Sequence, residues 1–354
     1  MTKGATSEGG VLSERDERLA YFDRADRYTP FLATKVAGGA KFLVKTEDKH
    51  IGRSLFSKQG RGELAALERA VLAIRGLLGD AAIANRSFVD VGANIGTTTI
   101  PALLTHGFES AVAIEPEPEN VRVLRLNVIL NDLEDRITVL GVAASNEVGE
   151  SDLVVDRSRG GKHWIATDRG KLRRKNLAEN EILAVETVTL DQLVESGVID
   201  ADRIGMLWMD AEAHEGHILE GGLSLLERSV PLVLEWNPVI LDRVGDRGKI
   251  ERAVAEGYTH FAGLHRNPDP SGPIFPLQTV DRLPAYAERF LDRSNMLTKT
   301  DILVLRLEPD QAAGIADLDQ FLGHSPVDDE PLGAAGGRGG LFARLRARLS
   351  GRRI

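Results

Sequence analysis

A hydrophobic strand that runs into a glycine turn and then into a helix is the feature that most constrains the fold. The segment reads FVDVGANIGT over residues 88–97. Gly92 and Gly96 let the backbone turn tightly and approach a ligand closely. A turn of this kind favours an α/β protein with a ligand crevice at the carboxyl end of the strand.

Short apolar runs alternate with helical stretches from Ser87 onward, which is typical of a doubly wound parallel sheet. Seven runs are candidate central strands: SFVDV, AVAIE, RITVLGV, GMLWMD, PLVLEW, YTHFAGL and DILVLRL. Helices are expected near residues 97–104, 119–130, 216–228 and 247–256. We therefore predict a Rossmann-like α/β fold with a mostly parallel seven-stranded sheet, flanked by helices and preceded by a small N-terminal cap.

The chain is long enough to bury a full core, since 42% of its 354 residues are apolar. We expect a mobile head over residues 1–39 that contributes little to the core, and a cap over residues 40–85. The cap would hold two short strands within 41–56 and a helix over 63–78. The main domain is expected over residues 86–310, followed by a linker and a basic tail over 311–354.

The composition excludes several classes of protein. The absence of cysteine rules out disulfides and thiolate metal sites. The first thirty residues lack a signal-peptide pattern, and no apolar run approaches the roughly 20 residues that cross a bilayer. A net charge of −9 argues against a general nucleic-acid binder. We expect a cytoplasmic protein.

Two basic segments lie outside the α/β alternation. An insertion over residues 156–180 carries eight lysines and arginines and is either a solvated loop or a flap over an acceptor that bears phosphate or carboxylate groups. The tail LFARLRARLSGRRI places leucines 341, 345 and 349 on one helical face among arginines. Weak peripheral contact with the inner face of an anionic membrane is the minority interpretation of this tail.

The glycine turn and the next strand indicate the cofactor. Gly92, Asn94 and Gly96 form a Gly-x-Asn-x-Gly spacing that departs from the dinucleotide fingerprint. Asp90, at the end of the strand, can attract the ammonium of a bound amino acid, which S-adenosylmethionine carries and NAD does not. Glu115, nineteen residues past Gly96, can accept hydrogen bonds from ribose hydroxyls. We therefore predict S-adenosylmethionine as the cofactor.

Other interpretations of these residues remain open. The glycines can simply make a tight turn, and Glu115 can be a solvated strand end. Ser145, which follows the third strand, is our candidate for the adenine side.

These motifs, together with IEPEPENVRVLRLNVILN, WMDAEAHEG, LVLEW and TDILVL, make the chain resemble the FkbM-type methyltransferases over roughly residues 60–307. The resemblance implies a class I, S-adenosylmethionine-dependent fold that usually methylates hydroxyls of sugars, polyketides or other secondary-metabolite and surface-glycan precursors. The family motif at the fourth strand usually reads Lys-x-Asp-x-Glu-Gly-x-Glu. Here Asp210, Glu212 and Glu215 match the motif, whereas Trp208 and Ala213 replace its lysine and glycine. The position of Glu63 in Gly60-x-x-Glu63 makes it a candidate substrate contact.

Methyl transfer to a hydroxyl requires alignment of the reactants and benefits from a base, which typically contributes 10²–10⁴-fold. Asp210 closes a buried strand, and its carboxylate needs a partner there. Asp210 and His214 are the best candidates for the base, although His214 can equally be a helix-start residue that faces solvent. His163 and His265 are weaker candidates.

The substrate side is less constrained by the sequence. His163, Trp208, Glu212 and Glu235 are candidate contacts. Trp208 and Trp236 could form an apolar or sugar-stacking wall, with core packing as the favoured role for each. A Mg²⁺ site from Asp210, Glu212 and Glu235 is conceivable, but the spacing does not indicate a metal.

The prediction is thus an O-methyltransferase that acts on a small-molecule or carbohydrate acceptor, in glycan or secondary-metabolite biosynthesis, and not on nucleic acid. An N-methyltransferase with a small acceptor would share every cofactor residue. A non-catalytic nucleotide-binding scaffold and an NAD-dependent oxidoreductase are the alternatives from other classes, and the glycine spacing disfavours the oxidoreductase.

Overall fold

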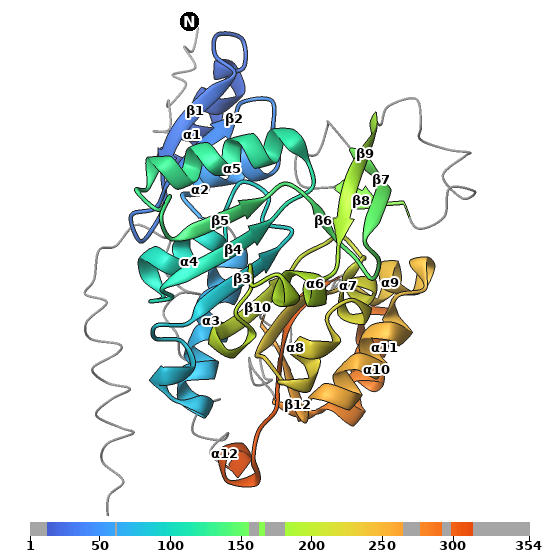
Figure 1. Ribbon diagram of the computed structural model, residues 1–354. Coiled ribbons are helices and arrows are strands. Elements are labelled where there is room, and N and C mark those ends of the chain that lie inside the picture. Colours follow the sequence, from blue (N-terminus) through green and yellow to red (C-terminus); the bar gives the residue numbers. More distant parts are fainter. Residues whose placement is uncertain are drawn as a thin grey trace, which may run out of the picture.

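All seven predicted strands lie in one eight-stranded sheet (Figure 1). The computed structural model describes residues 13–60, 62–155, 163–166, 181–264, 277–291 and 299–313. The eighth strand, β13 (Gln278–Thr279), is a two-residue edge strand that the sequence did not predict. The predicted strands are β3 (Ser87–Val91), β4 (Ser110–Ile114), β5 (Ile137–Leu140), β10 (Ile204–Met209), β11 (Leu232–Trp236), β12 (His260–Gly263) and β14 (Thr300–Leu305).

The strand order is β13-β12-β14-β11-β10-β3-β4-β5. β3 is parallel to both of its neighbours, β4 and β10. β14 is antiparallel and lies between β11 and β12. The chain builds the sheet outward from β3 in one direction and then from β10 in the other. In open α/β sheets, ligands bind at the carboxyl ends of the strands beside such a switch in order.

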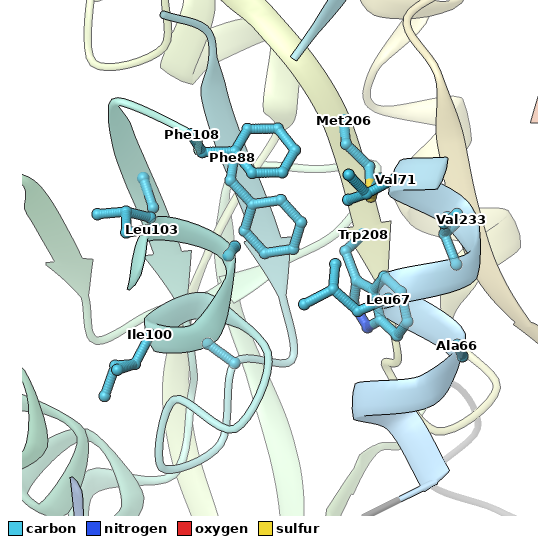
Figure 2. Packing of buried hydrophobic residues seen from close by; sticks show 14 of the residues in the cluster. Ala66, Leu67, Val71, Phe88, Ile100, Leu103, Phe108, Met206, Trp208 and Val233 are labelled. Carbon is cyan, nitrogen blue, oxygen red and sulfur yellow. The ribbon is translucent and has the colours of Figure 1, made fainter. Parts of the chain in front are cut away.

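Successive side chains of a strand point to opposite faces of the sheet. Both faces of this sheet are apolar, and helices cover each of them. In β3, Phe88 belongs to one hydrophobic cluster and Val89 to the other. The Phe88 cluster, part of which Figure 2 shows, includes residues of α3 (Gly62–Leu78), α4 (Thr99–Thr105) and α5 (Pro118–Leu130). The Val89 cluster includes residues of α6 (Leu190–Glu195), α7 (Glu215–Glu220), α8 (Leu223–Glu227), α9 (Pro238–Val244), α10 (Arg247–Gly257) and α11 (Leu283–Leu291).

One predicted helix, near residues 216–228, is divided into α7 and α8. Gly221 and Gly222 separate the two helices. A Cβ on Gly221 would lie 2.2 Å from the backbone oxygen of Ser145, so only glycine allows this close approach.

The N-terminal region differs from the prediction at two points. β2 (Lys41–Lys45) pairs with β1 (Phe31–Lys35), and the second expected strand is instead the helix α2 (Ile51–Lys58). The Asp48 carboxylate accepts hydrogen bonds from three backbone N–H groups at the start of α2, which satisfies donors that a helix leaves free. The helix α1 (Glu14–Ala25) packs against α2 and buries Phe22 completely. The described part of the expected head therefore contributes to the core.

Side-chain amides on α5 and at its C-terminal cap attach β2 to the main domain. The fully buried Asn127 accepts a hydrogen bond from the Leu43 N–H at 2.7 Å and donates one to the Ile95 oxygen at 2.9 Å. Asn131 accepts a hydrogen bond from the Lys41 N–H at 2.9 Å. The cap and the main domain thus share half-buried polar contacts.

A second sheet, of order β6-β9-β7-β8, was not predicted. It consists of β6 (Ala143–Ala144), β7 (Gly149–Val155), β8 (His163–Ile165) and β9 (Glu181–Val188). β7 and β9 are antiparallel and flank the basic insertion. Apart from residues 163–166, the insertion lies outside the described residues, as do His265 and the basic tail from residue 314 onward.

Three short 3-10 helices and one further α-helix complete the described secondary structure: η1 (Asp80–Ala82), η2 (Ala201–Arg203), η3 (Val280–Arg282) and α12 (Pro309–Ala313). Within the ranges given above, no helix combines the length and hydrophobicity that crossing a bilayer requires.

Candidate active site

A cavity of about 320 Å³ lies at the carboxyl ends of β3, β4 and β10, where the strand order switches. It brings together residues that are far apart in the sequence. Nine predicted site residues are among those that line it: Glu63, Gly92, Asn94, Glu115, His163, Trp208, Asp210, Glu212 and His214. Asp90, Gly96, Ser145 and Glu235 are not lining residues.

Gly92 is required by a close approach of two loops. Its φ of 85° lies in the left-handed region, and a Cβ there would lie 2.0 Å from the backbone oxygen of Asp210. The Asp210 N–H also donates a hydrogen bond to the Val91 oxygen at 3.0 Å. The loop after β3 therefore positions the loop after β10. Gly96, with φ of 91°, packs against side chains of Leu124 and Ile100 behind the cavity.

Glu115 is held at the cavity wall by backbone donors. Its Oε2 accepts a hydrogen bond from the Asn94 N–H at 2.9 Å, and its Oε1 accepts one from the Glu117 N–H at 3.0 Å. The side chain is buried, and burial raises its pKa to about 7. The carboxyl thus connects the two loops that follow β3 and β4.

Asp90 lies behind the cavity rather than on its wall. The fully buried carboxylate accepts hydrogen bonds from the hydroxyls of Thr98, at 2.6 Å, and Thr99. Burial raises its pKa to about 6 despite these two bonds. Thr98 itself lines the cavity, so Asp90 contributes to the cavity wall indirectly, by holding the Thr98 side chain just before α4.

Carboxylates gather around Asp210 at one end of the cavity. Burial raises the pKa of Asp210 well above its usual range, and the nearby Glu235, Glu212 and Glu63 raise it further. Lys299 opposes this rise and forms an ion pair with Glu235. Glu235 therefore lies behind the wall, paired with a lysine that does line the cavity.

The backbone beside Asp210 is unusual. Glu212 and Ala213 have φ values of 47° and 70°, in the left-handed region that non-glycine residues rarely adopt. Two such residues in succession cost free energy that the surrounding contacts must offset. One of these contacts is a hydrogen bond of 2.8 Å from the Ala211 N–H to the buried Glu215.

His214 lies at the other end of the same loop. Its side chain contacts residues that do not line the cavity. Its Nε2 is 2.9 Å from the Ser145 hydroxyl, and its ring stacks on His217 at 4.5 Å. His217 in turn pairs with the fully buried Asp246. Burial and the nearby His217 lower the pKa of His214 to about 4, so its imidazole is neutral at neutral pH. His214 does not face solvent, since only 4% of it is exposed.

The two tryptophans do not share a wall. Trp208 is 2% exposed and packs in the same cluster as Leu67 and Val71 while touching the cavity (Figure 2). Trp236 belongs to the cluster on the opposite face of the sheet. The register explains this, because Trp208 faces Val233 and not Trp236 across β10 and β11.

Sequence reasoning missed Lys299. Among the described lining residues it is the only lysine or arginine. It precedes β14, and an antiparallel strand begins where its parallel neighbours end, so this position lies at the edge of the sheet that holds the cavity. Across the described ranges, no group of three or more histidine or acidic side chains is arranged to hold a metal ion.

The fold and this cavity define a Rossmann-like α/β protein with a ligand site at the switch in strand order. Residues 90–262, which span β3 to β12, match the Methyltransferase FkbM domain. This match assigns nearly half of the chain to the FkbM methyltransferase domain.

Solved structures of methyltransferases are also similar. The methyltransferase FkbM from Methylobacillus flagellatus is 15% identical with a TM-score of 0.38, and the match covers 62% of this chain and 43% of that chain. The chain thus spans less than half the length of that protein. The O-methyltransferase from Bacillus cereus, in complex with SAH, is 13% identical with a TM-score of 0.37, over 84% of this chain and 94% of that chain. No match was found among the curated proteins.

Proposed function

We propose that this protein transfers a methyl group from S-adenosylmethionine to a hydroxyl of a sugar, glycan or secondary-metabolite precursor. The observation that carries the proposal is the convergence of Gly92, Asn94, Glu115 and Asp210 on one cavity at the switch in strand order. The family assignment of residues 90–262 supports methyl transfer.

The residues of the cavity fit the proposed cofactor. S-adenosylmethionine supplies an activated methyl group on a sulfonium when it is bound. Glu115 would hold the ribose, because its carboxylate lies at the wall and can accept hydroxyl donors. Gly92 and Asn94 would let the backbone approach the amino-acid part, with Asp90 acting from behind through Thr98. Ser145 and His214 would border the adenine side.

Asp210 is the stronger candidate for the base. As the acceptor oxygen takes the methyl group, its proton would pass to a carboxylate oxygen of Asp210. The raised pKa of Asp210 makes its carboxylate a stronger base than an ordinary one. His214 is neutral and can also accept a proton, but its Nε2 already lies against the Ser145 hydroxyl and its lowered pKa makes it a weak base.

The acceptor end would bind a polyhydroxylated molecule through several hydrogen-bond acceptors. Glu63, Asp210 and Glu212 line this end, with Trp208 and His163 as further contacts. An N-methyltransferase would use the same cofactor residues and differ only in the acceptor. A panel of sugars and small amines separates the two, because each acceptor that is methylated releases S-adenosylhomocysteine.

Calorimetric titration with S-adenosylmethionine, S-adenosylhomocysteine and NAD tests the proposal. We expect micromolar binding of the two sulfur nucleotides, weakened at least tenfold in Glu115→Ala because charge-assisted hydrogen bonds contribute about 1.5–3 kcal/mol. Glu134→Ala, which changes an exposed glutamate before β5, is the matched control. Asp90→Ala should also weaken binding, whereas Asp210→Asn should spare binding and reduce turnover.

Preference for NAD would overturn the proposed cofactor. Unchanged affinity in Glu115→Ala would refute the ribose assignment alone. Tight cofactor binding without any turnover on the acceptor panel would favour a non-catalytic nucleotide-binding scaffold instead.

A further inference from the structure

Lys299 brings a positive charge to the acidic end of the cavity. It lines the cavity together with Asp210 and pairs with Glu235. We propose that Lys299 is a positioning residue for methyl transfer, whose ammonium keeps Asp210 available as a carboxylate that can take the proton of the acceptor. This inference rests on the proposed function and assigns to it a residue outside the sequence motifs.

The strand register places these three groups side by side. Met209 is opposite Leu234 in the parallel pair β10–β11, so Asp210 and Glu235 are the next residues at the carboxyl ends of neighbouring strands. Glu235 is opposite Asp301 in the antiparallel pair β11–β14. Lys299 lies two residues before Asp301 and therefore arrives at the same edge. The backbone pairing of β14 therefore places residue 299 at this edge.

Apart from Lys299, the charged groups of the described residues that act on Asp210 are acidic. Glu63 approaches from α3, Glu235 from β11 and Glu212 from the segment of Asp210 itself. On the β3 side, the fully buried Asp90 is opposite Trp208 in the register. The remaining titratable residues of the cavity are Glu115, His50, His163 and His214.

The charge balance explains why Asp210 needs this lysine. Burial and neighbouring carboxylates both favour the protonated form of a carboxyl group, and a protonated carboxyl cannot accept a proton. An ammonium within about 4–6 Å of a carboxylate favours the ionised form by about 1–3 pH units. Lys299 therefore shifts Asp210 toward the form that the proposed reaction uses.

The side chain of Lys299 is suited to substitution. It is 52% exposed, whereas its partner Glu235 is 6% exposed, so a change at residue 299 does not open the core. Without Lys299, the carboxylate of Glu235 would lose its ion-pair partner and would add to the negative charge near Asp210. Removing the lysine should thus act on Asp210 both directly and through Glu235.

The test is a ¹³C NMR titration of aspartate carboxyl groups in the full-length protein without cofactor. Asp210→Asn identifies the signal of Asp210. We expect Lys299→Met to raise the titration midpoint of Asp210 and Lys299→Arg to leave it near that of the wild type. Glu235→Gln should lower the midpoint, because it removes a neighbouring carboxylate. Lys249→Met, which breaks an ion pair with Glu220 on α7, is the matched control and should change nothing.

Lys299→Met and Glu235→Gln are expected to shift the midpoint of Asp210 in opposite directions. Either variant can therefore test the inference if the other folds poorly. An unchanged midpoint in Lys299→Met, or a raised one in Glu235→Gln, would overturn it. Failure of the proposed function would look different, since the wild type would then not bind S-adenosylmethionine while the NMR titration still reported on Lys299. A role in stability alone would lower the melting temperature of Lys299→Met and leave the midpoint unchanged.

Discussion

Glu215 offers a quantitative test of how this site is held. It is the first residue of α7, and its carboxyl is fully buried. Oε1 accepts the hydrogen bond from Ala211, and Oε2 is buried without a hydrogen-bond partner among the described residues. Burial, and to a smaller extent Glu235, raises the pKa of Glu215 from 4.5 to about 8. The folded protein therefore keeps a proton on Glu215 at neutral pH.

The sign of the effect on stability follows from proton binding. Between pH 4.5 and about 8 the folded state holds a proton that the unfolded state has lost, so stability falls as the pH rises. At about 1.4 kcal/mol per pH unit, Glu215 lowers the free energy of unfolding by about 3 kcal/mol at pH 7 and by about 4–5 kcal/mol above pH 8.

Glu215→Gln removes this dependence while keeping an acceptor for Ala211. The amide nitrogen of the variant and the carboxyl proton of the wild type are equally unpaired, so the two proteins should be similar in stability at pH 5. The variant should become more stable than the wild type by about 4–5 kcal/mol at pH 9. Urea unfolding at pH 5, 7 and 9, followed by circular dichroism, measures the difference, and groups common to both proteins cancel.

Glu227→Gln, an exposed change on α8, is the control and should follow the wild type at each pH. Parallel stability curves for Glu215→Gln and the wild type would refute the conclusion that Glu215 is protonated in the folded protein.

Two further substitutions test the loops and the cap. Gly92→Ala should reduce the affinity for S-adenosylmethionine more than tenfold, because its Cβ would collide with the Asp210 backbone; Gly79→Ala has a similar φ but open space around it and should retain wild-type binding in the same calorimetric titration. Asn127→Ala should lower the free energy of unfolding by about 2–3 kcal/mol in urea, because the half-buried Leu43 N–H loses its acceptor and the Ile95 oxygen loses a buried donor. A loss below 0.5 kcal/mol would show that water replaces the amide.

The central sheet was predictable because its signal is local. Each strand is a short apolar run, and alternate residues such as Phe88 and Val89 supply opposite faces of one sheet. The glycine turn was predictable for the same reason, since Gly92 must have a left-handed φ. Convergence of Glu115 and Asp210 followed from the general rule that parallel strands end at one edge.

The features that escaped prediction depend on contacts between distant residues. The segment 51–58 is apolar enough for a strand, but Asp48 supplies the acceptors that start a helix. β7 begins with polar residues and gains its identity from β9 across the insertion. Lys299 enters the site only because β14 runs against its neighbours. Likewise, Ser145 and His214 contact each other across two loops. The periodicity of the sequence does not indicate that these loops lie close together.

The place of β14 in the sheet has a consequence for biosynthesis. Among the described strands, β14 is the last to leave the ribosome, yet it lies between β11 and β12, which were made earlier. Until it emerges, both of those strands present an unpaired edge, a template for pairing with other nascent chains. The domain can close its sheet and acquire Lys299 only after nearly all of the described chain has been translated, so its final folding step waits for β14 to emerge.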